Sequence, residues 1–81
     1  MKPPSIRLHG LPARRDPAWA AAWGAAEKAV ESFLDEPGCD DAGKNALYVI
    51  ACRGHRVQVY IVRNKRDLTV NVAIQEEVSR G

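Results

Sequence analysis

Three short runs of β-branched and aromatic residues, separated by two turn signals, constrain this sequence more than any other feature. The runs fall between Asn45 and Gln75, and the turn signals between them are Gly54 with His55 and the segment 64–67. This pattern predicts a meander of three antiparallel strands over residues 45–75. Counting outward from each turn then indicates on which side of the sheet each side chain lies.

Both turns predict the same inner face. If the first turn is a two-residue loop of Gly54 and His55, Arg53 pairs with Arg56. The second turn pairs Arg63 with Leu68 whether its loop has two or four residues. Alternation along the strands then places one largely apolar set on a single face: Tyr48, Ile50, Cys52, Val57, Val59, Ile61, Val70, Val72 and Ile74.

A helix is expected before the strands, over residues 16–36. Asp16 can cap the first free backbone N–H groups, and Pro17 fits the first helical position because no donor is needed there. Glu36 precedes Pro37, and the ring of a proline disfavours a helical residue before it. The helix is therefore expected to end near this proline.

Apolar residues at helical spacing predict which side of this helix is buried. The predicted core stripe, which includes both tryptophans, consists of Trp19, Trp23, Ala26, Val30 and Phe33, widened by Ala22, Ala29 and Leu34. The opposite, solvent-facing side would carry Ala21, Ala25, Lys28, Ser32 and Asp35. The core stripe would cover the inner face of the sheet.

The expected fold is a single α+β domain over residues 1–81, with one amphipathic helix packed on a three-stranded antiparallel meander. Residues 1–15 are expected to form either a flexible arm or a short edge strand at Ser5 to His9, which would make the order βαβββ. The outer sheet face is unusually apolar for a surface. It carries Leu47, Val49, Ala51, Gln58, Tyr60, Val62, Thr69, Asn71 and Ala73.

Three kinds of cover for the outer face are consistent with the sequence. The N-terminal segment could fold over it through Ile6, Leu8 and Leu11. Alternatively, two copies of the chain could pack their sheets together in a homodimer, or a different protein could dock there.

Composition argues for a water-soluble protein. Hydrophobic residues make up 46% of the chain and charged residues 27%, which is typical of globular domains. The longest apolar run, Ala46 to Cys52, is far shorter than the ~20 residues of a membrane-spanning helix, so no membrane partner is expected. The N-terminus lacks a secretory pattern, and two cysteines are too few for a disulfide framework. We therefore expect a cytoplasmic location.

No arrangement of residues predicts catalysis. Cys52 falls on the inner sheet face and His55 at a turn, so a thiolate and imidazole pair is not expected. A metal site built from Cys39, Cys52 and His55 would lack a fourth ligand. Glycine-rich phosphate-binding loops are not found in the sequence. The expectation is a protein that is not an enzyme, with no catalytic residue, no cofactor and no metal.

Charge is segregated along the chain. Residues 16–41 carry a net charge of −6, whereas residues 42–66 carry +6 and no acidic residue. The basic residues gather near the two turns, as Arg53, His55 and Arg56 at the first and Arg63, Lys65 and Arg66 at the second. Nucleic-acid binding through these basic hairpin tips is the alternative function, because such clusters attract phosphates.

Without a reaction motif, the sequence favours a small protein–protein interaction module. The partner would be another protein, or a second copy of the chain bound through the outer sheet face. The expected contact residues are apolar anchors beside basic side chains: Leu47, Val49, Tyr60, Val62, Arg63, Lys65 and Arg66. In size and organisation the chain resembles the small phage proteins that block host machinery, such as anti-CRISPR proteins, which implies a stoichiometric inhibitor or adaptor.

Overall fold

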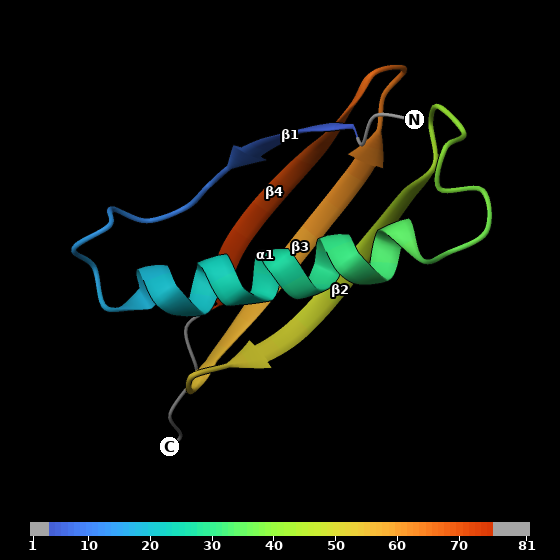
Figure 1. The fold of residues 1–81 in the computed structure, drawn as a ribbon. Helices are drawn as coiled ribbons and strands as arrows, with labels where there is room; N and C mark the ends of the chain where they lie inside the picture. Colours follow the sequence, from blue (N-terminus) through green and yellow to red (C-terminus); the bar gives the residue numbers. More distant parts are fainter. Residues whose placement is uncertain (1–3, 76–81) are drawn as a thin grey trace.

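One helix lies across one face of a four-stranded sheet in the computed structural model, which describes residues 4–75 (Figure 1). The elements follow one another as β1 (Ser5–His9), α1 (Ala18–Leu34), β2 (Asn45–Cys52), β3 (His55–Arg63) and β4 (Asp67–Gln75). This confirms the expected α+β class and the βαβββ order, with residues 5–9 forming a strand. No helix in residues 4–75 is long and apolar enough to span a membrane.

The sheet is mixed, with the strand order β1-β4-β3-β2. Strands β2, β3 and β4 form the expected antiparallel meander, while β1 runs parallel to β4, with Ser5 opposite Asp67. The two edges therefore differ. Strand β1 is five residues long and carries Arg7, whose Nε lies 3.0 Å from Asp67 Oδ2, whereas the eight-residue β2 has no charged side chain.

The turn between β2 and β3 differs from the expectation by one position. Cys52 lies opposite His55, so the loop consists of Arg53 and Gly54 and not of Gly54 and His55. Both loop residues have positive φ, 51° at Arg53 and 81° at Gly54. A type I′ turn requires this conformation and is favoured because its twist matches that of the strands.

The pairing of β2 with β3 is consequently displaced by two residues from the expected register. An even displacement leaves every side chain on its face, because the alternation along a strand has a period of two. The second turn pairs Arg63 with Leu68 as expected. All nine predicted inner-face side chains are buried or half-buried, and they pack with the helix into a single core.

Helix α1 begins at Ala18 and ends at Leu34, two residues inside the expected boundary at each end, with Pro17 at the N-cap position. The backbone N–H of Ala18 donates a hydrogen bond of 2.8 Å to Asp16 Oδ1, which satisfies one of the free donors at the helix start. At the other end, the Asp35 N–H bonds to Ser32 O at 3.3 Å, and that of Glu36 to Phe33 O at 3.1 Å. These bonds close the last turn.

The buried side of α1 was predicted in part, since Ala22, Ala26, Ala29 and Phe33 are buried as expected. Ala21 and Ala25, expected to face solvent, are fully buried, while Trp23 and Leu34 are each 38% exposed. The residues that contact the sheet are mostly alanines, and their small side chains allow a close approach of the helix. At Gly24, an added Cβ would lie only 3.1 Å from Cys52 Sγ. The space between the helix and the sheet is too narrow here for an indole ring, so the tryptophans lie beside the contact between α1 and the sheet and not within it.

Candidate interaction surfaces

The outer face of β2 and β3 exposes a cluster of large apolar side chains. Leu47 is 57% exposed, Val49 56% and Tyr60 40%. Leu47 and Tyr60 are directly opposite each other in the β2–β3 register, so their side chains are neighbours on this face. Val62 lies on the same face but is half-buried. We call Leu47, Val49, Tyr60 and Val62 the outer patch.

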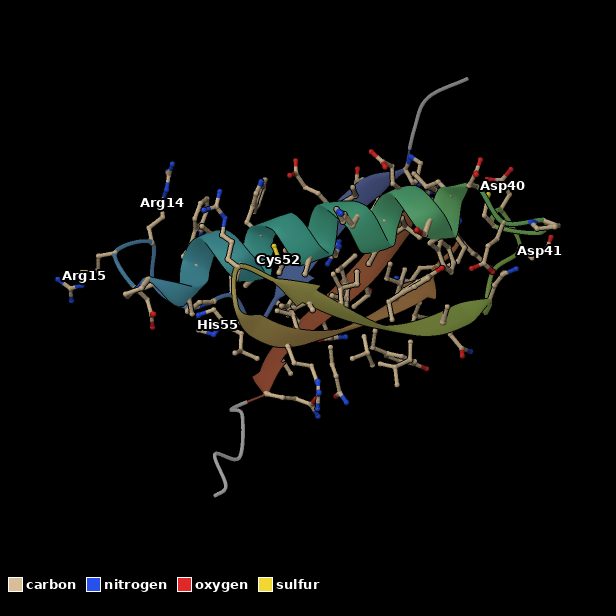
Figure 2. The ribbon with its side chains drawn as sticks, turned by 90° about the horizontal axis from the view of Figure 1, so that it is seen from below. Arg14, Arg15, Asp40, Asp41, Cys52 and His55 are labelled. Carbon is tan, nitrogen blue, oxygen red and sulfur yellow. The ribbon has the colours of Figure 1, made fainter. Side chains whose placement is uncertain are left out.

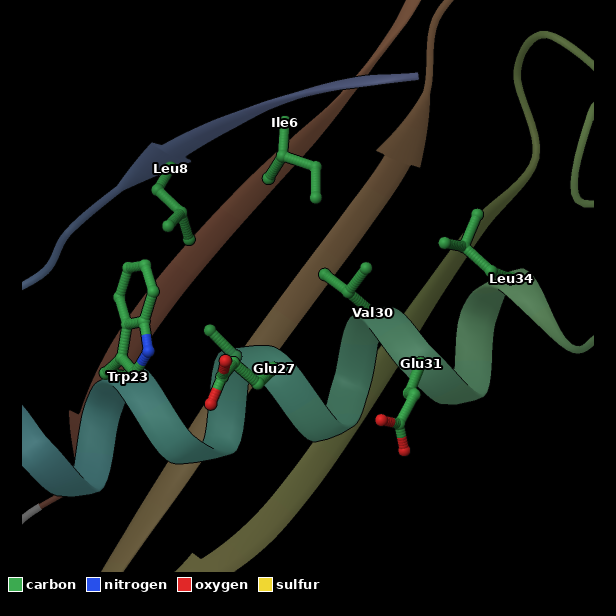
Figure 3. A pocket seen from close by; sticks show the side chains of 8 residues that line it. Ile6, Leu8, Trp23, Glu27, Val30, Glu31 and Leu34 are labelled. Carbon is green, nitrogen blue, oxygen red and sulfur yellow. The ribbon is translucent and has the colours of Figure 1, made fainter. Parts of the chain in front are cut away.

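The N-terminal segment does not cover the outer patch. Ile6 and Leu8 of β1 extend toward the helix, on the opposite face of the sheet (Figure 3). Leu11 also packs against the core on the helix side. The first of the three explanations for the apolar outer face is therefore wrong, because β1 continues the sheet at the edge of β4 and does not form a layer above it.

Strand β2 is an open edge, and its exposed apolar residues lie along it. A two-residue hairpin loop closes with a hydrogen-bonded pair, which here is Cys52 with His55. Bonded and non-bonded pairs alternate in an antiparallel ladder, so alternate residues of β2 direct their backbone N–H and C=O groups away from β3. These residues are Asn45, Leu47, Val49 and Ala51.

A groove of about 320 Å³ lies between β1 and α1 (Figure 3). Ile6 and Leu8 form one wall, and Trp23, Val30 and Leu34 of the helix form the other. The sequence does not predict this site, because the apolar spacing of the helix places Trp23 and Leu34 in the core. No local signal could have placed β1 opposite them, since that arrangement depends on the pairing of β1 with β4.

Two further arginines lie at the same end of the molecule as the basic residues of the first turn, and the sequence did not predict this proximity. Arg53 and Arg56 are exposed and His55 is half-buried. Arg14 and Arg15, in the loop between β1 and α1, lie at the same end of the molecule as His55, whereas Asp40 and Asp41 lie at the other end of the helix (Figure 2). The guanidinium of Arg14 lies 5.0 Å from the centroid of the Trp19 ring.

Arg63 differs from the other basic residues of the second turn. Lys65 and Arg66 are exposed, but the Arg63 side chain is only 12% exposed and its Nη2 lies 3.9 Å from Asp40 Oδ1. Its Nε and Nη1 are buried without a hydrogen-bond partner in the described structure. Arg63 therefore contributes little to the accessible surface of this turn.

The cysteines and acidic residues do not converge in the described structure. Within residues 4–75, no group of three or more His, Cys, Asp or Glu side chains could hold a metal ion. Both cysteines are free thiols, and Cys39 Sγ donates to Leu34 O at 3.3 Å. Cys52 lies beside Gly24 of the helix.

Comparisons with protein-family models, with curated protein sequences and with solved structures found no match to this chain. The arrangement on its own defines an α+β domain with a mixed four-stranded sheet, one face covered by the helix, one open face, and two edges formed by the short β1 and the longer β2.

Proposed function

We propose that this protein is a small protein-binding module and that its contact surface consists of the outer patch and the open edge of β2. The observation that carries the proposal is the exposure of Leu47, Val49 and Tyr60 side by side on adjacent strands. Neighbouring exposed apolar residues of this size are typical of protein interfaces. Lys65 and Arg66 would lie at the polar rim of such an interface, and the buried Arg63 would not.

A second copy of the chain is the simplest partner for this surface. Charged residues and prolines on an edge strand usually prevent it from pairing with another chain. Strand β2 contains neither. Two copies could pack their outer patches face to face about a two-fold axis, which would bury Leu47, Val49 and Tyr60 of both copies. Because β2 carries both Leu47 and Val49, its open edge would lie beside this interface.

Light scattering of the wild-type chain and of a Leu47→Ser, Tyr60→Ser double variant tests this function. We expect a dimer in the wild type at micromolar concentration and a monomer in the variant. Ile6→Ser with Leu34→Ser is the matched control, because it removes the same kind of exposed apolar surface from the other face. Circular dichroism would verify that each variant is folded.

A different protein as partner gives another supporting result: a monomeric wild type whose co-purifying partner is lost from the outer-patch variant and kept by the control. The proposal is wrong if the outer-patch substitutions change neither the mass of the particle nor any captured partner. If this protein acts as a stoichiometric inhibitor or adaptor, each chain would bind one copy of the captured partner through the outer patch.

Nucleic-acid binding is the second candidate, favoured by the position of Arg14 and Arg15 at the same end as His55, whose sequence neighbours Arg53 and Arg56 are exposed. Its expected signature is affinity for a duplex or single-stranded oligonucleotide that falls steeply with salt, because counterions are released on binding. Arg14→Ala with Arg15→Ala should weaken this affinity and reduce the salt dependence. Absence of binding at low salt would eliminate this candidate.

A further inference from the structure

The exposed large apolar side chains of residues 4–75 form two separate groups. Leu47, Val49 and Tyr60 belong to the outer patch, and the remaining three, Ile6, Trp23 and Leu34, all line the groove between β1 and α1. Ile6 is 47% exposed. The groove is thus a second apolar surface, and it lies on the opposite face of the sheet from the outer patch.

The groove exists because the helix covers only part of its face of the sheet. The backbone of helix α1 lies close to β2, β3 and β4 and farther from β1. A helix is about 10 Å wide and strands are spaced about 4.8 Å apart, so one helix covers roughly two of the four strands. The uncovered strip lies beside β1.

The helix wall of the groove follows the repeat of a helix-pairing face. Trp23, Val30 and Leu34 are spaced by seven and four residues, which places them along one stripe of α1. The stripe extends over about 16 Å of helix length at 1.5 Å per residue. Ile6 and Leu8 oppose it from β1 (Figure 3). A second helix could lie parallel to this stripe, with its apolar side chains between the two walls.

Two carboxylates mark the rim of the groove. Glu27 and Glu31 line it from α1 and are exposed. Within residues 4–75, neither has a cationic partner at ion-pair distance. Carboxylates four residues apart on one helix repel each other, and a basic partner would relieve this repulsion. The rim is therefore complementary to positive charge.

We infer that the groove between α1 and β1 binds an amphipathic helix of a partner protein, whose apolar ridge enters the groove and whose Lys or Arg residues face Glu27 and Glu31. This helix-in-groove mode uses apolar anchors at the spacing of one helix face. The binding site is independent of the outer patch and of its proposed function.

The chain carries its own reporter for this interaction. Its two tryptophans, Trp19 and Trp23, stack with ring centroids 5.5 Å apart, and Trp23 lines the groove. The probe is a synthetic helical peptide with leucines at positions i, i+3, i+4 and i+7 and lysines beside them. A second peptide carries glutamates in place of the lysines. We expect a saturable blue shift of the emission with the lysine peptide and about tenfold weaker binding of the glutamate peptide at low salt.

Two variants and one control complete the test. Exchange of both carboxylates, Glu27→Lys with Glu31→Lys, should reverse the preference between the peptides without touching the core. Ile6→Ser should weaken binding of the lysine peptide about tenfold through loss of apolar contact. The Leu47→Ser, Tyr60→Ser variant should bind it as the wild type does.

Equal binding of the two peptides, or an unchanged preference after the charge exchange, would overturn the inference. It would also be overturned by a wild-type dimer that Ile6→Ser dissociates, because a second copy of the chain would then occupy the groove.

Discussion

The hydroxyl group of Tyr48 donates a hydrogen bond of 2.6 Å to Glu36 Oε2 and so joins strand β2 to the segment that follows the helix. Lys44 adds to this junction, since its Nζ lies 3.4 Å from Glu36 Oε1 and donates to Pro37 O at 2.6 Å. The hydrogen bond from Tyr48 lowers the pKa of Glu36, with a further contribution from Lys44. Burial, followed by the hydrogen bond to Glu36, raises the pKa of Tyr48 to about 12.

This junction predicts an alkaline loss of stability. The pKa of Tyr48 is higher in the folded than in the unfolded chain, so its contribution is fully present below pH 10 and is lost as the pH rises toward 12. The urea midpoint of Tyr48→Phe should therefore lie below that of the wild type at pH 8, and the difference should shrink between pH 10 and 12. Tyr60→Phe is the control. A difference that is constant with pH would contradict the prediction.

The same contact has a counterpart on the acid side. Because the pKa of Glu36 is lowered on folding, its contribution is present above the ordinary glutamate value of 4.5 and is lost as the pH falls below it. Glu36→Gln should reduce the acid dependence of the urea midpoint between pH 5 and 2. Equal slopes in Glu36→Gln and wild type would refute the assignment.

Arg53 occupies a conformation that suits other residues better. Its φ of 51° is the one positive value among the non-glycine residues of 4–75, and the first position of a type I′ turn favours asparagine. Arg53→Asn should raise the free energy of unfolding by about 0.5–1 kcal/mol, measured by urea denaturation. Arg66→Asn, at an exposed turn position, should remain within about 0.5 kcal/mol of wild type.

Gly10 and Gly43 provide a matched pair of glycines with similar backbone angles and different surroundings. Their φ values are 90° and 94°, but an added Cβ at Gly10 would collide with the backbone oxygen of Val72, whereas at Gly43 nothing lies within 4 Å. Gly43→Ala should cost only the backbone term of about 1–2 kcal/mol. Gly10→Ala should cost clearly more and should loosen β1, visible as faster amide exchange at residues 5–9. Similar losses for both variants would show that the contact is not tight.

Two substitutions test which side of α1 faces the sheet: Ala25→Leu and Trp23→Leu. Ala25 is fully buried, so a larger side chain there should destabilise the fold by about 1–3 kcal/mol. Trp23 is 38% exposed, and its replacement should cost less. The opposite order in urea denaturation would restore the helix face predicted from the sequence.

The strands were predictable because their information is local. Each turn signal determines which of the neighbouring residues share a face of the sheet. The inner face was therefore predicted correctly even though the loop consists of Arg53 and Gly54 and not of Gly54 and His55. The helix face was not predictable by the same means, because alanines surround α1 and give no preferred side, which left the tryptophans to decide the prediction. A large aromatic side chain normally indicates burial, but the size of these rings excludes them from the layer beside Cys52.

The interaction surfaces were predictable in part. The outer patch follows from strand alternation and was located correctly on the sheet, although its binding role stays a prediction. The groove depends on the pairing of Ile6 with Leu68, residues that lie far apart in the sequence and carry no shared local signal. The burial of Arg63 against Asp40 likewise results from the path of the loop before β2.

The parallel pairing of β1 with β4 has a consequence for the order in which the molecule forms. Ser5 pairs with Asp67 and His9 with Asn71, so β1 is synthesised before the helix and has no neighbour until β4 has followed it. The β2–β3 hairpin is joined by a tight loop, and closing a short loop costs less entropy than closing the long segment between β1 and β4. The register of this sheet therefore favours a folding order in which the meander forms first and β1 is added to it.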